Sequence, residues 1–133
     1  KAIEVHNGEK IAIFSTGAIF EEVTIAYDIL RKDGFDPAVY TFPTVKPIDS
    51  NLIERIAKDF DLIVTCEEHN IVGGFGSAVS EVVAELPKRK AVLKRIGIND
   101  EYSIIVGNQK YLRHRYGIDG ESIAKKILEI ING

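Results

Sequence analysis

Short apolar runs separated by helical patterns are the feature that most limits how this chain can fold. The runs at 11–15, 38–42 and 61–66 are almost continuously apolar, which is typical of strands that are buried on both faces. In the segments between them, apolar residues recur at helical spacing. This alternation predicts an α/β fold in which helices cover both faces of one sheet.

The pattern also predicts where individual elements lie. The run at 61–66 is the most uniformly apolar and is expected at the centre of the sheet, whereas 91–96 alternates with charge as an edge strand does. Residues 67–77 are interpreted as a loop, and residues 1–8 as the tail of a preceding linker. Helices are expected over 19–30, from Asp49 or Ser50 onward, over 79–86, over 108–116 and after Asp119.

Composition excludes several classes of protein. With 133 residues, 45% of them apolar, the chain is expected to form one domain over 1–133. The single cysteine, Cys66, excludes an internal disulfide and fits a reducing, cytoplasmic setting. The net charge of −3 and the short apolar runs predict binding to neither nucleic acid nor membrane. Because methionine is absent, even at position 1, we expect a piece of a longer polypeptide.

Charge is distributed unevenly along the chain. Residues 88–115 hold eight basic and two acidic residues, a net charge of +6. The remaining nine basic and eighteen acidic residues give −9 elsewhere. The basic stretch is interpreted either as a solvated or subunit-facing surface, or as a patch for a phosphorylated substrate or an acidic partner.

Candidate functional residues follow the strand at 61–66. Glu67, Glu68 and His69 combine two carboxylates with an imidazole, a set capable of general acid–base chemistry. The alternative is that these polar side chains cap a loop or meet a partner subunit. Polar residues also follow the strand at 11–15, in the sequence Ser15-Thr16-Gly17-Ala18. Both positions lie where open α/β sheets bind ligands, beyond the carboxyl ends of their strands.

A glycine-rich segment comes next, with Gly73, Gly74, Gly76 and Ser77. Its pattern is GxGxxV and lacks the lysine of a phosphate-binding loop, so it is a weak nucleotide signature. We favour a tight loop that lets a helix pack closely on the sheet. We expect Gly74 and Gly76 to permit the turn of the backbone, with Gly74 as the candidate for a positive φ, and Ser77 to start the helix.

Metal ligands and a cysteine nucleophile are not expected. His6 and His114 have no partners at ligand spacing, so no metal site is proposed. Cys66, on a buried strand, is interpreted as a small apolar residue.

Three segments resemble the C-terminal domain of transketolase-like thiamine diphosphate enzymes. They are KIAIFSTG, VTCEEHNIVGGFGSAVSEV and YGIDGESIAKKI, in the family's order and across nearly the whole chain. The middle segment is the closest, from Thr65 through Glu81, and His69 beside Glu68 resembles the transketolase branch. The pattern is shared with deoxyxylulose-5-phosphate synthases and, more loosely, with the beta subunits of 2-oxoacid dehydrogenases.

The resemblance implies a three-layer α/β/α open sheet, mostly parallel, with one strand reversed. It implies a complete enzyme that moves a two-carbon ketol unit between sugar phosphates of the pentose phosphate type. Thiamine diphosphate and a divalent metal, Mg²⁺, would be bound by other domains, with none in this chain. The enzyme would be a homodimer or heterotetramer.

In this interpretation, the domain itself has no catalytic residue. Its segment from Glu67 to Ser77 would lie at the rim of the active site or at a subunit interface. The alternatives are the corresponding domain of a deoxyxylulose-5-phosphate synthase or a 2-oxoacid dehydrogenase, or a free-standing anion-binding or regulatory module that uses the helix start at GGFGS.

Overall fold

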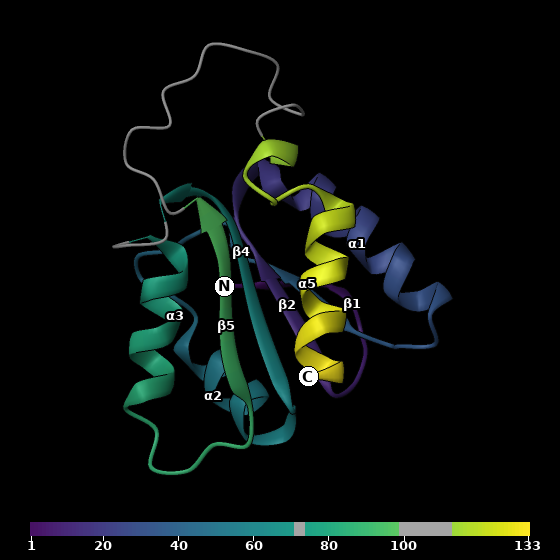
Figure 1. Cartoon of the computed structure of the whole chain (residues 1–133). Coiled ribbons are helices and arrows are strands. Elements are labelled where there is room, and N and C mark those ends of the chain that lie inside the picture. Colours follow the sequence, from purple (N-terminus) through teal and green to yellow (C-terminus); the bar gives the residue numbers. More distant parts are fainter. Residues whose placement is uncertain (71–73, 99–112) are drawn as a thin grey trace.

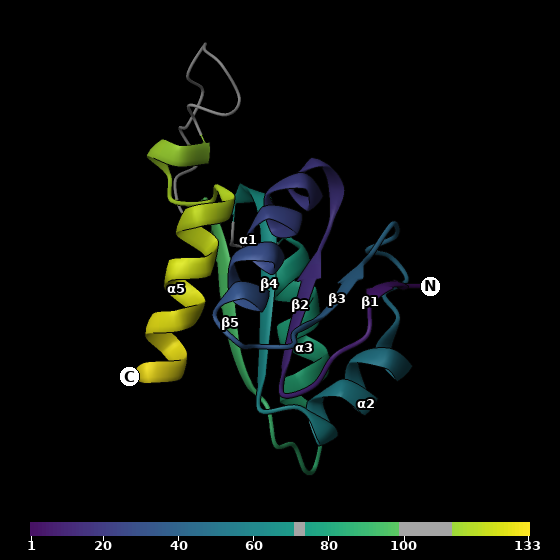
Figure 2. The same cartoon turned by 90° about the vertical axis from the view of Figure 1, so that its right-hand side faces the viewer.

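A computed structural model describes residues 1–70, 74–98 and 113–133, and it shows one five-stranded sheet. The strand order is β1-β3-β2-β4-β5, which Figure 2 shows from one face of the sheet. The strands β3, β2, β4 and β5 are parallel to one another, and β1 pairs antiparallel with β3. The strands are β1 (Ile3–His6), β2 (Ile11–Ser15), β3 (Ala38–Thr41), β4 (Leu62–Asn70) and β5 (Val92–Ile98).

Helices cover both faces of the sheet and make the three layers that were predicted (Figure 1). A short 3-10 helix, η1 (Gly17–Ile19), leads into α1 (Phe20–Lys32), which packs beside α5 (Gly120–Asn132) on one face. On the other face lie α2 (Ser50–Asp59) and α3 (Phe75–Ala84). Within the described residues, no helix is long and apolar enough to cross a membrane.

Strand β2 is the centre of the core, and every one of its residues is buried. Its side chains alternate between the layers: Ile11 and Ile13 pack with α1 and α5, whereas Phe14 packs with α2 and α3. The Phe14 ring lies 5.0 Å from that of Phe42, whose centroid is 5.1 Å from that of Phe75. The two faces therefore have separate apolar cores that share one sheet.

The structure corrects three expectations. The centre of the sheet is β2, and β4 lies between it and the edge strand β5, which is at the edge as predicted. Strand β4 continues to Asn70 where a loop was expected, so Glu67 and Glu68 belong to the strand. Residues 3–6, expected within a linker tail, form β1. Of the helix expected over 108–116, residues 108–112 lie outside the described residues. Residues 113–115 are helical.

Strand β1 escaped detection because its side chains are half-buried or exposed, so no apolar run marks it. Val5 packs partly against the core and His6 stacks on Tyr27, and polar contacts add to these. The Asp49 carboxylate accepts the Ala2 N–H at 3.0 Å and also caps α2 through the Leu52 N–H at 3.3 Å. The Tyr40 hydroxyl donates to Glu4 at 3.0 Å. These bonds lie beyond the reach of local sequence patterns.

Replacing Ile63 by alanine tests the assignment of β4 to the core. Ile63 is fully buried in an interior strand, so Ile63→Ala is expected to lower the free energy of unfolding by about 2–5 kcal/mol. Ile3→Ala is the matched control, because Ile3 is 55% exposed and lies on the edge strand β1. Chemical denaturation measures both variants, and equal midpoints would contradict the assignment.

Candidate functional site

The candidate site is the edge of the sheet at which the parallel strands end. The carboxyl ends of β2 and β4 are adjacent there, since Ser15 pairs with Cys66. After β2, Gly17 adopts a positive φ of 67° and the chain turns into η1 and α1. The Thr16 hydroxyl donates to the Phe42 carbonyl at 3.0 Å, which ties this turn to the end of β3.

Glu67 fills the N-terminus of α3. Its side chain is almost completely buried, and its two carboxylate oxygens accept the N–H groups of Phe75 at 2.9 Å and Gly76 at 2.7 Å. A helix N-terminus presents free N–H groups and a partial positive charge, so a carboxylate there is stabilised. Because the Glu67 carboxylate already accepts hydrogen bonds from these two amides, they are not available to bind a separate anion. This geometry argues against the alternative of an anion-binding module that uses the GGFGS helix start.

Gly76 is required by close packing rather than by a turn. It lies in the first turn of α3, and an added Cβ would be 2.8 Å from Glu67 Oε2 and 2.9 Å from Thr65 Oγ1. The expectation of a positive φ at Gly74 is wrong, because Gly74 is the N-cap in an extended conformation, with φ −94°. Helix α3 begins at Phe75, so Ser77 is within the helix rather than at its start.

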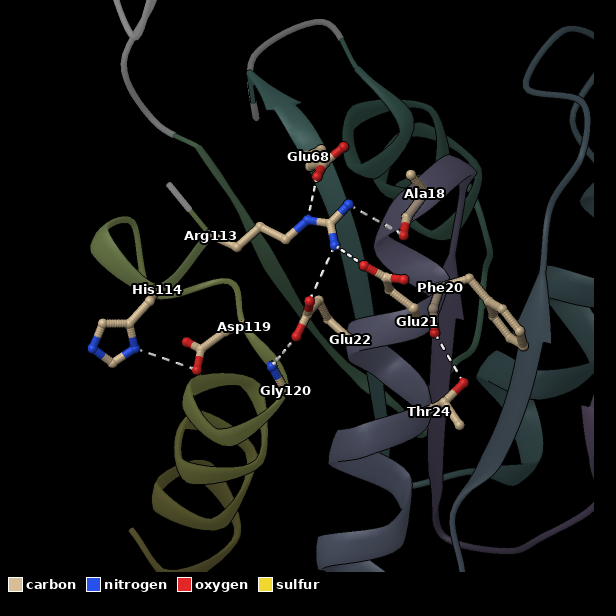
Figure 3. Close-up of polar contacts among 10 residues, drawn as sticks. All are labelled: Ala18, Phe20, Glu21, Glu22, Thr24, Glu68, Arg113, His114, Asp119 and Gly120. Atoms are coloured by element: carbon tan, nitrogen blue, oxygen red, sulfur yellow. Dashed lines mark hydrogen bonds and ion pairs between the residues drawn. The ribbon is translucent and has the colours of Figure 1, made fainter. Parts of the chain in front are cut away.

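Arg113 is the centre of a second polar cluster, on the opposite face of β4 (Figure 3). Its side chain is only 2% exposed and donates to three carboxylates. Nε donates to Glu68, and Nη1 donates to Glu21 and, at 3.1 Å, to Glu22. Nη2 reaches the Ala18 carbonyl at 3.5 Å. One guanidinium thus joins the end of β4 to η1 and α1.

The carboxylates determine the charge of Arg113. Burial alone lowers its pKa, but the hydrogen bonds that Arg113 donates to Glu68, Glu21 and Glu22 outweigh burial and raise the pKa above its usual value. The guanidinium therefore stays charged. Three acidic residues surround this one cation, and the most exposed of them is Glu21, whose side chain is 59% exposed.

Glu22 connects the cluster to the last helix. Its side chain is buried, and Oε1 accepts the Gly120 N–H at 2.9 Å, at the N-terminus of α5. The helices approach closely here, because a Cβ on Gly120 would lie 2.5 Å from the Ile25 side chain. Sequence reasoning missed both Glu22 and Arg113. A signal existed for Glu22, which falls on the apolar stripe of α1 with Val23 and Ala26.

The predicted residues therefore separate into two clusters. Glu67 and Gly76 meet under α3, and the Ser77 hydroxyl there accepts a hydrogen bond from Arg95 at 3.1 Å, whereas Glu68 lies with Arg113. His69 continues strand β4, but its side chain and Gly73 lie outside what the structure describes. Both glutamates make structural contacts, Glu67 with the start of α3 and Glu68 with Arg113.

Two negative expectations concern Cys66 and metal ions. Cys66 is fully buried, and burial raises the pKa of its thiol to about 12, so it remains protonated as an apolar core residue. Among the described residues, no group of three histidine, cysteine or acidic side chains is arranged to hold a metal ion.

Comparison with known proteins gives consistent matches. The family described as "Transketolase, C-terminal domain" matches residues 1–123. A transketolase C-terminal section of Methanocaldococcus jannaschii is 42% identical over 92% of this chain and 37% of that protein. A 1-deoxy-D-xylulose-5-phosphate synthase of Dehalococcoides mccartyi is 36% identical over 94% of this chain and 20% of the length of that synthase.

The structural comparison leads to the same family. A solved structure described as "Split gene transketolase, inactive beta4 tetramer" superposes with a TM-score of 0.83 at 26% identity, over 97% of this chain and 40% of that chain. Across these matches, the chain spans between a fifth and two fifths of the length of its relatives.

Replacing Gly76 by alanine tests the close approach of α3 to β4. In an open helical position, alanine would stabilise by about 1 kcal/mol over glycine. At Gly76 the new methyl group meets Glu67 and Thr65, so Gly76→Ala is expected to destabilise by about 1–3 kcal/mol. Ser80→Ala, which adds no atom to the same helix, is the control. A Gly76→Ala variant with a raised melting temperature would contradict the packing.

Replacing Arg113 by alanine tests the second cluster. The change leaves the buried Glu22 carboxylate without its cation and is expected to cost about 3–5 kcal/mol of unfolding free energy. Arg31→Ala is the control, because the Arg31–Asp36 ion pair is about half exposed and is expected to contribute about 0–1 kcal/mol. Denaturant titration compares the two variants, and a similar small loss in both would show that the cluster is dispensable.

Proposed function

Because the chain belongs to the family of transketolase C-terminal domains, we propose that it completes an enzyme that transfers a two-carbon ketol unit between sugar phosphates. The similarity to a split-gene transketolase chain, of which this chain covers 40%, supports a protein with further domains, on the same chain or on a partner subunit. In this proposal the assembled enzyme is a homodimer or heterotetramer, and this domain contributes to its assembly and to the rim of its active site.

The observation that carries the role is the pair of contacts at the end of β4. Glu67 holds the start of α3, and Glu68 holds Arg113 with α1 behind it. His69 and Asn70 follow Glu68 on the strand, at the edge where α/β sheets present functional groups. Such an edge suits a surface that another domain or subunit packs against.

The cofactor in this proposal is thiamine diphosphate with Mg²⁺, held by other domains. The described residues of this chain do not fit it. The amides of Phe75 and Gly76 at the N-terminus of α3 are occupied by Glu67, and no metal-binding cluster is present in the described ranges. In this proposal, cofactor binding belongs to the other domains.

A second candidate function is supported by one comparison. The relative from Dehalococcoides mccartyi is a 1-deoxy-D-xylulose-5-phosphate synthase and is 36% identical. The complete enzyme would then form 1-deoxy-D-xylulose 5-phosphate rather than exchange ketol units between sugars. The two activities have different products, so a product assay distinguishes them.

The test is an assay of the complete enzyme with thiamine diphosphate and Mg²⁺, in which both products are measured. We expect ketol transfer, and His69→Ala is expected to weaken dimerisation or kcat/KM while leaving the melting temperature nearly unchanged. His114→Ala, an exposed histidine on another segment, is the matched control. Unchanged assembly and kinetics in His69→Ala would remove the rim role. Formation of only the deoxy sugar phosphate would favour the second candidate.

Calorimetry of this chain alone separates its contribution from that of the other domains. We expect neither transketolase activity nor tight binding of thiamine diphosphate in the presence of Mg²⁺. Micromolar binding to the chain alone would contradict the proposed division of roles.

A further inference from the structure

Strand β5 is an open edge of the sheet. It pairs with β4 on one side, and no described strand pairs with its other side. Figure 1 looks toward this edge and shows α3 on one side of β5 and α5 on the other. Val92, at the start of the strand, is 53% exposed although valine is apolar. The outer backbone groups of such a strand can pair with an added strand.

The side of β5 that faces α3 is cationic. Two adjoining hollows share Ser80 and Arg89, and the one along β5, of about 420 Å³, is also lined by Arg95. Residues 88–95 hold five basic side chains and no acidic one, and all five are exposed. One of them, Lys90, is paired with Asp61 at 3.0 Å. Lys88, Arg89 and Arg95 keep a positive charge on this side of the edge, whereas Lys94 lines the hollow on the α5 side.

The side of β5 that faces α5 is mainly apolar, although the hollow there is also lined by Lys10, Asp61 and Lys94. A hollow of about 490 Å³ opens there, between the start of β5 and the end of α5. Leu93 packs with the α2 and α3 core and Ile96 with the α5 core, so alternate residues of β5 face the two sides. The apolar residues lining the hollow are Ile11, Phe35, Leu62, Val92, Ile130 and Ile131.

We propose that the β5 edge and its two flanking hollows bind an extended, acidic segment of a partner protein, which adds a strand to the sheet. Successive side chains of an added strand point to opposite faces. A segment that alternates acidic and apolar residues therefore places carboxylates beside Arg89 and Arg95, and apolar side chains beside Val92 and Ile131. The proposal concerns a different surface from the rim at β4 and does not depend on the enzymatic activity proposed above.

Charge selects among the possible occupants. A second copy pairing through the same edge would bring two sets of five basic side chains together, and like charges on paired strands are destabilising. Single-stranded nucleic acid would match the charge, but its phosphates gain nothing from the apolar hollow beside Val92. An acidic and apolar peptide matches both sides.

The test uses fluorescence anisotropy of the whole protein with labelled octapeptides. The probe alternates valine and glutamate. One control has the same composition in two blocks, and a second control alternates valine and lysine. We expect the alternating acidic peptide to bind with Kd below roughly 1 mM and at least about tenfold more tightly than either control. Its binding is also expected to slow amide hydrogen exchange within residues 92–97.

Two variants locate the site. Lys88→Glu/Arg89→Glu is expected to weaken binding of the acidic peptide by at least about tenfold. Lys32→Glu/Lys125→Glu makes the same change of charge on exposed positions of α1 and α5 and is expected to leave binding within about twofold. Ile131→Asp places a charge at the apolar hollow and is expected to weaken binding as well. Circular dichroism verifies that each variant is folded.

Several results would overturn the proposal. These are absence of binding at 1 mM peptide, equal binding of the two-block peptide, and equal effects of the two double variants. Binding of an oligouridylate in place of the acidic peptide would assign the edge to nucleic acid instead.

Discussion

The buried guanidinium of Arg113 is the interaction on which one half of this structure depends. Burial of a charge is costly unless opposite charges and hydrogen bonds surround it, and here three carboxylates and a carbonyl do so. Those carboxylates come from α1 and from the end of β4. Through Glu22 the same cluster reaches the first amide of α5. Helices α1 and α5 are therefore positioned by a polar centre as well as by their apolar contact.

The other half depends on a carboxylate rather than a guanidinium. Glu67 accepts two amides at the start of α3, and the missing side chain of Gly76 lets the helix come close enough for these bonds. In many α/β proteins a helix start of this kind holds a ligand's phosphate. Here the protein's own Glu67 side chain takes that place, so the anion-binding capacity of this helix N-terminus has a structural use.

Much of the fold can be predicted from the sequence because buried positions recur as apolar residues at the period of each helix or strand. The runs at β2, β3 and β4 and the stripes on α1, α2 and α5 are apolar at the spacing that their structure requires. Strand β1 and the last residues of β4 show no such apolar pattern, since their positions depend on strand pairing and on polar contacts with distant residues. The centre of the sheet was misplaced by one strand for a related reason: β2 and β4 are both interior, so both are apolar.

The candidate site was predictable in location but not in arrangement. The motif around Glu67 and Glu68 marks the end of β4, yet nothing local indicates that Arg113, 45 positions after Glu68, completes the cluster. Contacts between residues so far apart in the chain arise only from the tertiary fold. A positive φ was expected at Gly74, but Gly74 is extended. The structural need for a glycine lies at Gly76, where a side chain would clash with Glu67 and Thr65.

Neighbouring residues on a strand point to opposite faces, and this places Glu67 and Glu68 in different layers of the molecule. One peptide unit therefore links the anchor of α3 to the anchor of Arg113 and α1. A displacement of the backbone at that unit, such as a docking partner would cause, moves both anchors together. Strand β4 is therefore attached to both helical layers at one point, through the side chains of Glu67 and Glu68.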